Sequence, residues 1–361
     1  MIKTRKLAAL ILLLLLACGL ARGESLIALP GQAVITRPGS YRLRGRLSGG
    51  QVLIDAGKED AVTLILDGVD VRSSDFPAIE VRRAGQVRIV LEEGSLNTLR
   101  VGKGARAALL SKADLKVEGT GTLDIEALDG HGIQGKRDLS IMGGSTRIHA
   151  KKDGIKADGA LSILGGSHEV ADCQEGLEGH TVLISGGDIR INARDDGINA
   201  SSAQEVDLRQ LPDPSGENHW IKVTGGSLTI TARGDGMDAN GDLIISGGDI
   251  RISSPASARD GALDAHRDIT ISGGTLMAFG AAGEAEAPRD AGQSASLILL
   301  KKQVAGGHEV ILKNQAGESL MSFTPAQGWD SVALSHPRVQ QGDPCSLWAA
   351  GEKVADFVMG R

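Results

Sequence analysis

Six short phrases of the chain place polar side chains on either side of a glycine and an apolar residue. The phrases are His131-Gly-Ile-Gln134, Asp153-Gly-Ile-Lys156, Glu175-Gly-Leu-Glu178, Asp196-Gly-Ile-Asn199, Asp235-Gly-Met-Asp238 and, with one additional residue, Asp260-Gly-Ala-Leu-Asp264. Carboxylate and amide oxygens are the ligands that hard cations prefer, and calcium fits such a set best. The phrases therefore predict a calcium site, provided that the fold brings them together.

A second repeated phrase, a short apolar strand that ends in Gly-Gly, alternates with the first. Its copies begin at Asp114 (where Gly-Thr replaces Gly-Gly), Asp138, Ala160, Thr181, Trp220, Asp242 and Asp268, so successive copies lie 21 to 26 residues apart except for one gap of 39. Alternating β-branched residues around Gly-Gly predict a strand, a tight turn and a strand. A fixed period of this length indicates stacked repeats. We therefore predict an all-β fold, a single-stranded parallel β-helix with about 22 residues per coil and terminal caps.

Stacking would place equivalent residues of successive phrases about 4.8 Å apart, in two neighbouring columns. The predicted metal ligands in these columns are Asp153, Glu175, Glu178, Asp196, Asn199, Asp235, Asp238, Asp260 and Asp264. Two carboxylates about 5 Å apart repel by roughly 0.8 kcal/mol in water and by about 3 kcal/mol at an effective dielectric of about 20. Such a ladder needs a cation, raised pKa values or interleaved lysines and asparagines. A solvated ladder without an ion is the alternative interpretation.

The N-terminal residues 1–23 have the features of an export signal. A basic segment precedes the apolar run Leu7–Ala17, which is too short to span a bilayer. Cleavage before Cys18, as in a lipoprotein, and cleavage after Gly23 are both consistent with the sequence. We expect an exported protein of the periplasm, the cell envelope or the extracellular space, whose only membrane contact would be a lipid anchor at Cys18.

The rest of the chain divides at the point where the Gly-Gly phrases stop. We predict a β-helix over residues 24–290, with an N-terminal cap in its first part, and a C-terminal β cap over residues 291–361. An insertion at 201–218 has the composition of an ordered loop or lid, although a tolerated insertion is an equal alternative. Trp220 follows it and is, with Lys156, a predicted substrate-binding residue. Cys173 and Cys345 could form a disulfide or remain two buried thiols.

Composition limits the range of partners. The formal charge is −6 and only eight residues are aromatic, so neither a basic surface nor a stacking platform for nucleic acid is expected. We expect a monomer.

The phrases resemble a bacterial family of exported carbohydrate-binding β-helix proteins, related in shape to calcium-dependent pectate lyases. The match extends from about Ser40 to Phe357, and its specific stretches are 66–69, 235–242, 260–265, 271–276 and 322–325. The resemblance implies a right-handed helix that binds calcium, with affinity for acidic plant polysaccharide such as polygalacturonate, and for cellulose, without established catalytic activity. Lys156 and Glu178 depart from the Asp or Asn that is commoner in their column, which leaves the number of ions open.

Three functions follow as hypotheses. The leading one is a non-catalytic, calcium-dependent carbohydrate-binding protein in which the ion bridges the columns to uronate carboxylates. The second is a pectate-type polysaccharide lyase in which Lys156 removes the proton next to the uronate carboxyl. Surrounding carboxylates should raise the pKa of Lys156, which is unfavourable for a base near neutral pH, so we do not expect an enzyme. The third is a structural envelope or adhesion protein whose ladder only stabilises the coils.

Overall fold

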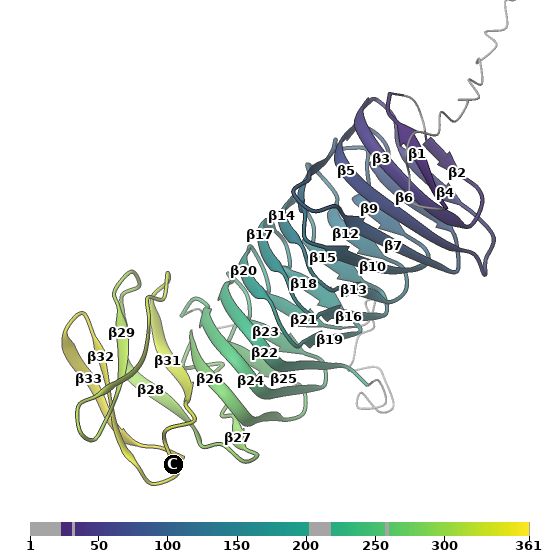
Figure 1. Ribbon diagram of the computed structural model, residues 1–361. Coiled ribbons are helices and arrows are strands. Elements are labelled where there is room, and N and C mark those ends of the chain that lie inside the picture. The colour runs from purple at the N-terminus through teal and green to yellow at the C-terminus, as the bar shows by residue number, and fades with distance from the viewer. Residues whose placement is uncertain (1–22, 31–32, 202–217, 257–259, 361) are drawn as a thin grey trace, which may run out of the picture.

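The computed structural model describes residues 23–30, 33–201, 218–256 and 260–360. All regular elements in these ranges are strands, numbered β1 to β33, and they contain no helix. About nine turns of about 24 residues form a β-solenoid, as the repeats predict (Figure 1). No described helix therefore has the length and apolar character needed to cross a bilayer.

One row of the solenoid is a ten-stranded parallel sheet, here called sheet B, to which each coil contributes one short strand. Its strands are β2 (Ala33–Ile35), β4 (Val52–Asp55), β6 (Ile79–Arg83), β9 (Ala107–Ser111), β12 (His131–Gly135), β15 (Ile155–Ala157), β18 (Leu177–Gly179), β21 (Ile198–Ala200), β23 (Met237–Ala239) and β25 (Leu263–Ala265). The central apolar residues of the phrases stack inward in register, for example Ile155 on Leu177 and Ile198 on Met237. Each of these four side chains is at most 1% exposed, so this column is part of the core.

A second sheet of 19 strands, sheet A, forms two further rows, in which the strands pair in parallel except at the C-terminal end of the sheet. The rows are joined because some strands belong to both; β22, for example, pairs with β19 in one row and with β20 in the other. Its strands are β1 (Glu24–Ala28), β3 (Gly39–Ser48), β5 (Ala61–Ser73), β7 (Gln86–Leu91), β8 (Leu96–Val101), β10 (Asp114–Gly119), β11 (Thr122–Ala127), β13 (Leu139–Ile141), β14 (Ser145–Ala150), β16 (Ala160–Ile163), β17 (Ser167–Cys173), β19 (Thr181–Ile184), β20 (Asp188–Ala193), β22 (Trp220–Thr231), β24 (Asp242–Ser253), β26 (Ile269–Gly280), β27 (Arg289–Asp290), β28 (Ala295–Val304) and β31 (Trp329–Ser335).

The Gly-Gly pairs are the bends between these two rows. In the earlier coils they separate two strands, as predicted, whereas β22, β24 and β26 each run through the pair as one bent strand. The ladder register shifts at the bend, between Val223 and Ser227 in β22. The second glycine of that pair, Gly226, has a φ of 88°, in the left-handed region that side-chain-bearing residues avoid. Glycine therefore permits the sharp change of direction.

The two ends of the solenoid are covered differently. At the N-terminal end β1 pairs with β3 and β2 with β4, both in parallel, so β1 and β2 already stack on the coil that follows them. At the other end β31 pairs antiparallel with β26, and a four-stranded sheet follows, drawn in yellow-green to yellow in Figure 1. The strands of this sheet are β29 (Val310–Asn314), β30 (Ser319–Phe323), β32 (Pro344–Ala349) and β33 (Glu352–Val358). Cys173 and Cys345 are buried free thiols, not a disulfide.

Candidate functional site

The Asp-Gly phrases are the corners at which the chain passes from sheet A into sheet B. At Gly197 an added Cβ would lie 2.5 Å from the Gly236 carbonyl oxygen and 2.3 Å from Ile230 Cγ2, so only glycine fits. The next residue, Ile198, is fully buried. Because successive side chains of a strand alternate between its faces, Asn199 points away from the core. The corner thus holds polar groups on the outside of the coil.

Strand pairing confirms the predicted stacking of the phrases. The second polar position forms one column through five strand pairs, in the order Gln134, Lys156, Glu178, Asn199, Asp238 and Asp264. The first position is linked from coil to coil by backbone hydrogen bonds, such as the one that the Gly197 N–H donates to the backbone carbonyl oxygen of Asp235 at 2.9 Å. At the last coil the Gly236 N–H donates instead to Gly261, because the additional residue of that phrase shifts Asp260 out of register.

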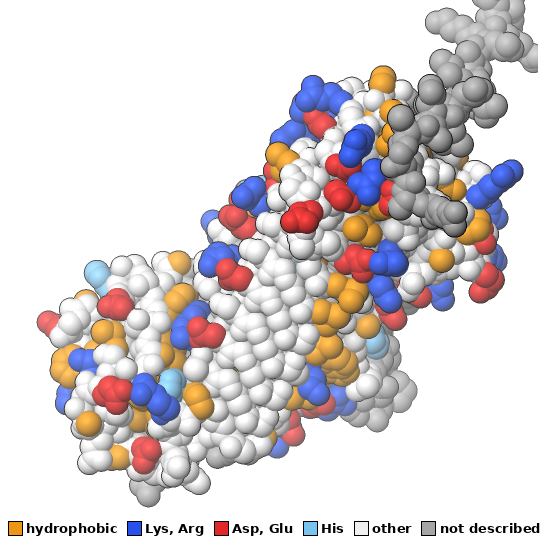
Figure 2. Space-filling view, in the orientation of Figure 1, with side chains coloured by type: hydrophobic (Ala, Val, Ile, Leu, Met, Phe, Trp, Pro, Cys, Tyr) orange, Lys and Arg blue, Asp and Glu red, His pale blue; other side chains and the backbone are white. Residues whose placement is uncertain are grey.

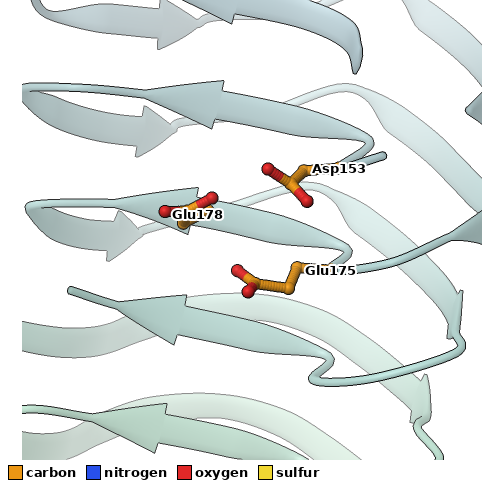
Figure 3. A group of neighbouring side chains, drawn as sticks. All are labelled: Asp153, Glu175 and Glu178. Carbon is orange, nitrogen blue, oxygen red and sulfur yellow. The ribbon is translucent and has the colours of Figure 1, made fainter. Parts of the chain in front are cut away.

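The columns contain two groups of three carboxylates, and in each group one oxygen from each residue lies within 4.8 Å of the other two. The upstream cluster consists of Asp153, Glu175 and Glu178, which Figure 3 shows converging from neighbouring coils. The downstream cluster consists of Asp196, Asp235 and Asp238. Such a spacing is compatible with carboxylates that share one cation.

The upstream cluster contains its own positive charge. The Lys156 ammonium contacts Glu178 closely and lies 3.5 Å from Asp153 Oδ2, and His131 Nδ1 lies 3.1 Å from the same oxygen. Burial would raise the pKa of Asp153, but its contacts with His131, Glu178 and Lys156 lower it to about 2. Burial and the nearby Glu178 and Asp153 raise the pKa of Glu175 to about 9, so Glu175 is neutral near pH 7. Charge is therefore largely compensated within this cluster.

The downstream cluster has no such compensation. No described Lys, Arg or His lies within ion-pair distance of its three carboxylates. Burial raises the pKa values of its members, and the charged groups that add most to the effect are all carboxylates. The values are about 6 for Asp196, about 8 for Asp235 and about 7 for Asp238. A cluster of this kind holds protons or a cation at neutral pH.

Backbone hydrogen bonds orient the downstream carboxylates. Asp196 Oδ1 accepts the Asp235 N–H at 2.8 Å, and Asp235 Oδ1 accepts the N–H of Gly261 from the following coil. The second oxygen of each carboxylate remains for another partner. Asn199, in register beside Asp238, has a buried Oδ1 without a hydrogen-bond partner. A buried amide oxygen in this position fits a cation that the surrounding oxygens would share.

The remaining predicted residues lie outside the two clusters. Asp264 stacks on Asp238 and contributes to the raised pKa values, whereas Asp260 acts on Asp196 from the shifted final phrase. Lys156, a predicted substrate-binding residue, is engaged by the upstream carboxylates. Trp220 lies on sheet A, paired with Thr181 and Asp242. Most of the insertion, residues 202–217, falls outside the described residues.

Two acidic residues near the downstream cluster were not among the predicted ligands. Asp195 raises the pKa of Asp196 and of Asp238, and it immediately precedes the phrase that supplies Asp196. Glu286 also raises the pKa of Asp238, and its Oε2 accepts the Ala265 N–H at 3.2 Å. Glu286 follows the last Gly-Gly phrase, so the repeat gives no signal for it, whereas the Asp195-Asp196 doublet is visible in the sequence.

Comparison with known proteins gives one family. The family model described as "Carbohydrate-binding domain-containing protein" matches residues 31–280. A carbohydrate-binding domain-containing protein of Acetivibrio thermocellus is 32% identical over 126 residues, which cover 32% of this chain and 44% of that protein. The match thus spans less than half the length of that relative.

One solved structure is also similar. It is the polysaccharide lyase-like protein from C. thermocellum, a gadolinium derivative, with a TM-score of 0.43 and 24% identity over 71% of this chain and 87% of that one. The family model, by contrast, covers most of the chain, including every coil that contributes to the two clusters. The chain therefore belongs to the family of carbohydrate-binding domain-containing proteins.

Proposed function

We propose that the protein is a non-catalytic module that binds an acidic, polygalacturonate-like polysaccharide through a calcium ion held by the downstream cluster. Membership of a carbohydrate-binding family supports a carbohydrate as the ligand. The observation that carries the proposal is the convergence of Asp196, Asp235 and Asp238, half-buried, with one oxygen of each within 4.8 Å of the others and no basic partner among the described residues. A cation would compensate their charge and lower the cost of keeping them ionised together.

The chemistry of the donor set favours calcium. All available donors are oxygens, and Asn199 adds a neutral amide oxygen with no other partner. Calcium takes about six to eight oxygen ligands in a flexible arrangement, so three carboxylates and an amide would leave positions for ligand oxygens. When bound, calcium would supply a bridge to a uronate carboxylate. The backbone bonds to Asp196 and Asp235 hold these side chains in position before the ion binds.

The upstream cluster argues against the lyase alternative. A lyase would need a neutral base, and Lys156 is the predicted candidate. Burial would lower the pKa of Lys156, but Glu178 and Asp153 raise it above its ordinary value, so the ammonium form predominates at neutral pH. A protonated amine between two carboxylates is a poor general base.

The experiment that tests the proposal is incubation with polygalacturonate in calcium and in a chelator. Pull-down reports binding, and the absorbance of unsaturated product reports cleavage. We expect calcium-dependent pull-down without growth of absorbance. Growth of absorbance would favour the lyase. Absence of both binding and cleavage would favour the structural or adhesion role. Cellulose serves as the neutral comparison, and stronger retention on cellulose than on polygalacturonate would refute the acidic ligand class.

A further inference from the structure

A groove of about 500 Å³ lies on the outer surface of sheet A, and its lining includes no residue of either carboxylate cluster. We call it the sheet A groove. Its volume is within the range of about 300 to 1,000 Å³ that is typical of small-ligand sites. Strands β11 and β14 line its centre, and Leu128, which is 54% exposed, offers an apolar surface at the turn after β11. Figure 2 shows charged side chains along the edge of the solenoid where Figure 1 labels β14, β17 and β20.

Most charges that line the groove are paired between adjacent coils. The pairs are Arg100 with Glu126 at 3.2 Å, Arg147 with Asp124 at 3.4 Å, and His149 with Asp172 at 3.0 Å. The Lys151 ammonium and the Arg194 guanidinium, at one end of the groove, have no carboxylate partner among the described residues. This end of the groove is therefore positively charged on an otherwise acidic protein.

The Arg194 guanidinium is held in place by the solenoid itself. Its Nε donates to the Cys173 carbonyl at 3.2 Å and its Nη2 donates to the Lys151 carbonyl, so the side chain spans coils at the corner. These bonds leave Nη1 without a described partner. A guanidinium fixed in this way presents N–H donors to a carboxylate at little entropic cost.

A local distortion shapes the neighbouring wall. Asp172 has a φ of 56° and lies in a bulge of β17, where the pairing with β20 shifts between Ala171 and Cys173. Left-handed backbone at a residue other than glycine is uncommon and strained. The bulge removes Asp172 from the ladder and leaves its side chain beside His149, on the wall of the groove.

One coil contributes residues both to the sheet A groove and to the downstream cluster. Arg194 precedes Asp196 by two residues, and both belong to the coil that also supplies Asn199. We propose that the sheet A groove is a second saccharide subsite, in which Lys151 and Arg194 bind a carboxylate of a uronate residue further along the polysaccharide held at the downstream cluster. This inference rests on the proposed function and extends it, since a chain bound at two subsites gains affinity with its length.

The test is the titration of the full-length chain with digalacturonate and with hexagalacturonate, in calcium and in a chelator. In calcium we expect Lys151→Gln and Arg194→Lys each to weaken hexagalacturonate binding by about tenfold, because charge-assisted hydrogen bonds are lost or misaligned. Digalacturonate, which can occupy the downstream cluster alone, should bind all variants within about twofold. Arg190→Gln is the control: Arg190 is bound to Asp188 at 2.7 Å on β20 and does not line the groove.

Calcium titration without sugar separates failure of this inference from failure of the proposed function. Unchanged calcium affinity together with weakened hexagalacturonate binding supports the second subsite. Wild-type hexagalacturonate affinity in both Lys151→Gln and Arg194→Lys would overturn the second subsite and leave the calcium proposal intact. Absence of calcium binding in the wild type would overturn the proposed function. In that case the groove would be supported as a saccharide subsite only if both variants lose hexagalacturonate binding in the chelator, and unchanged binding would overturn it as well. Lys151 is exposed and its side chain makes no described bond, so its variant keeps the fold.

Discussion

The stability of the calcium-free protein should fall as the pH rises. The pKa of Asp235 is raised from 3.8 to about 8 by burial and by Asp196 and Asp238, so between these values the folded chain holds a proton that the unfolded chain has released. A raised carboxyl pKa contributes stability that is complete below the unfolded value and is lost as the pH approaches the folded one. Asp238, with a pKa of about 7, acts in the same direction.

The magnitude follows from linkage. At about 1.4 kcal/mol per pH unit for one proton, Asp235 alone lowers the free energy of unfolding by about 3 kcal/mol between pH 5.5 and 8. The carboxyls interact, so their individual contributions do not add. Asp153, whose pKa is lowered to about 2, is ionised in both states over this range and contributes no slope. Glu175, with a pKa of about 9, adds to the decline.

Urea unfolding in a chelator at pH 5.5 and pH 8 measures this difference. Asp235→Asn should reduce it, because the amide keeps the shape and carries no proton to lose. The matched control is Asp188→Asn, on the preceding coil, where the carboxylate is 44% exposed and paired with Arg190. Saturating calcium should remove most of the decline in the wild type. The reasoning would be refuted if, in the chelator, the wild type had the same free energy of unfolding at both pH values. It would also be refuted if Asp235→Asn showed the same pH-dependent loss of stability as the wild type.

Three further predictions concern the upstream cluster, the corner and the anchor. Lys156→Gln removes the ammonium from the upstream cluster, so equilibrium dialysis should show an additional calcium ion per chain; an unchanged stoichiometry would contradict the role given to Lys156. Gly197→Ala should destabilise the fold by about 3 kcal/mol in urea unfolding, because its Cβ would overlap the Gly236 carbonyl oxygen, whereas Gly283→Ala, with no atom within 4 Å, should be neutral. Cys18→Ser should release the protein from membranes in cell fractionation if Cys18 carries a lipid anchor, and continued membrane association would refute that anchor.

The repeat made most of the fold predictable. Close contacts between coils require glycine in the Gly-Gly and Asp-Gly phrases. The spacing of these phrases in the sequence therefore gives the length of a coil directly. The bend of β22, β24 and β26 through Gly-Gly without a break was not predictable, because it depends on the local ladder register. The C-terminal four-stranded sheet has no repeat, and the antiparallel pairing of β31 with β26 in sheet A brings together segments that carry no common signal.

The sequence predicts which residues form the candidate site better than it predicts their charge states. Column positions follow from the period, and the register confirms them from Gln134 to Asp264. The division into a compensated and an uncompensated cluster depends on where the Lys156 ammonium lies, which the sequence alone does not determine. Glu286 acts on the downstream cluster from outside the repeat. The sheet A groove is shaped in part by a bulge at Asp172, which no local sequence pattern predicts.

The most direct test of the calcium-dependent site is isothermal titration of wild type and Asp235→Asn with calcium at pH 8, followed by retention on polygalacturonate. We predict one tight calcium ion in the wild type, at least about tenfold weaker binding in Asp235→Asn, and a matching loss of retention. Full-strength calcium binding and retention in Asp235→Asn would contradict the assignment of the site to the downstream cluster.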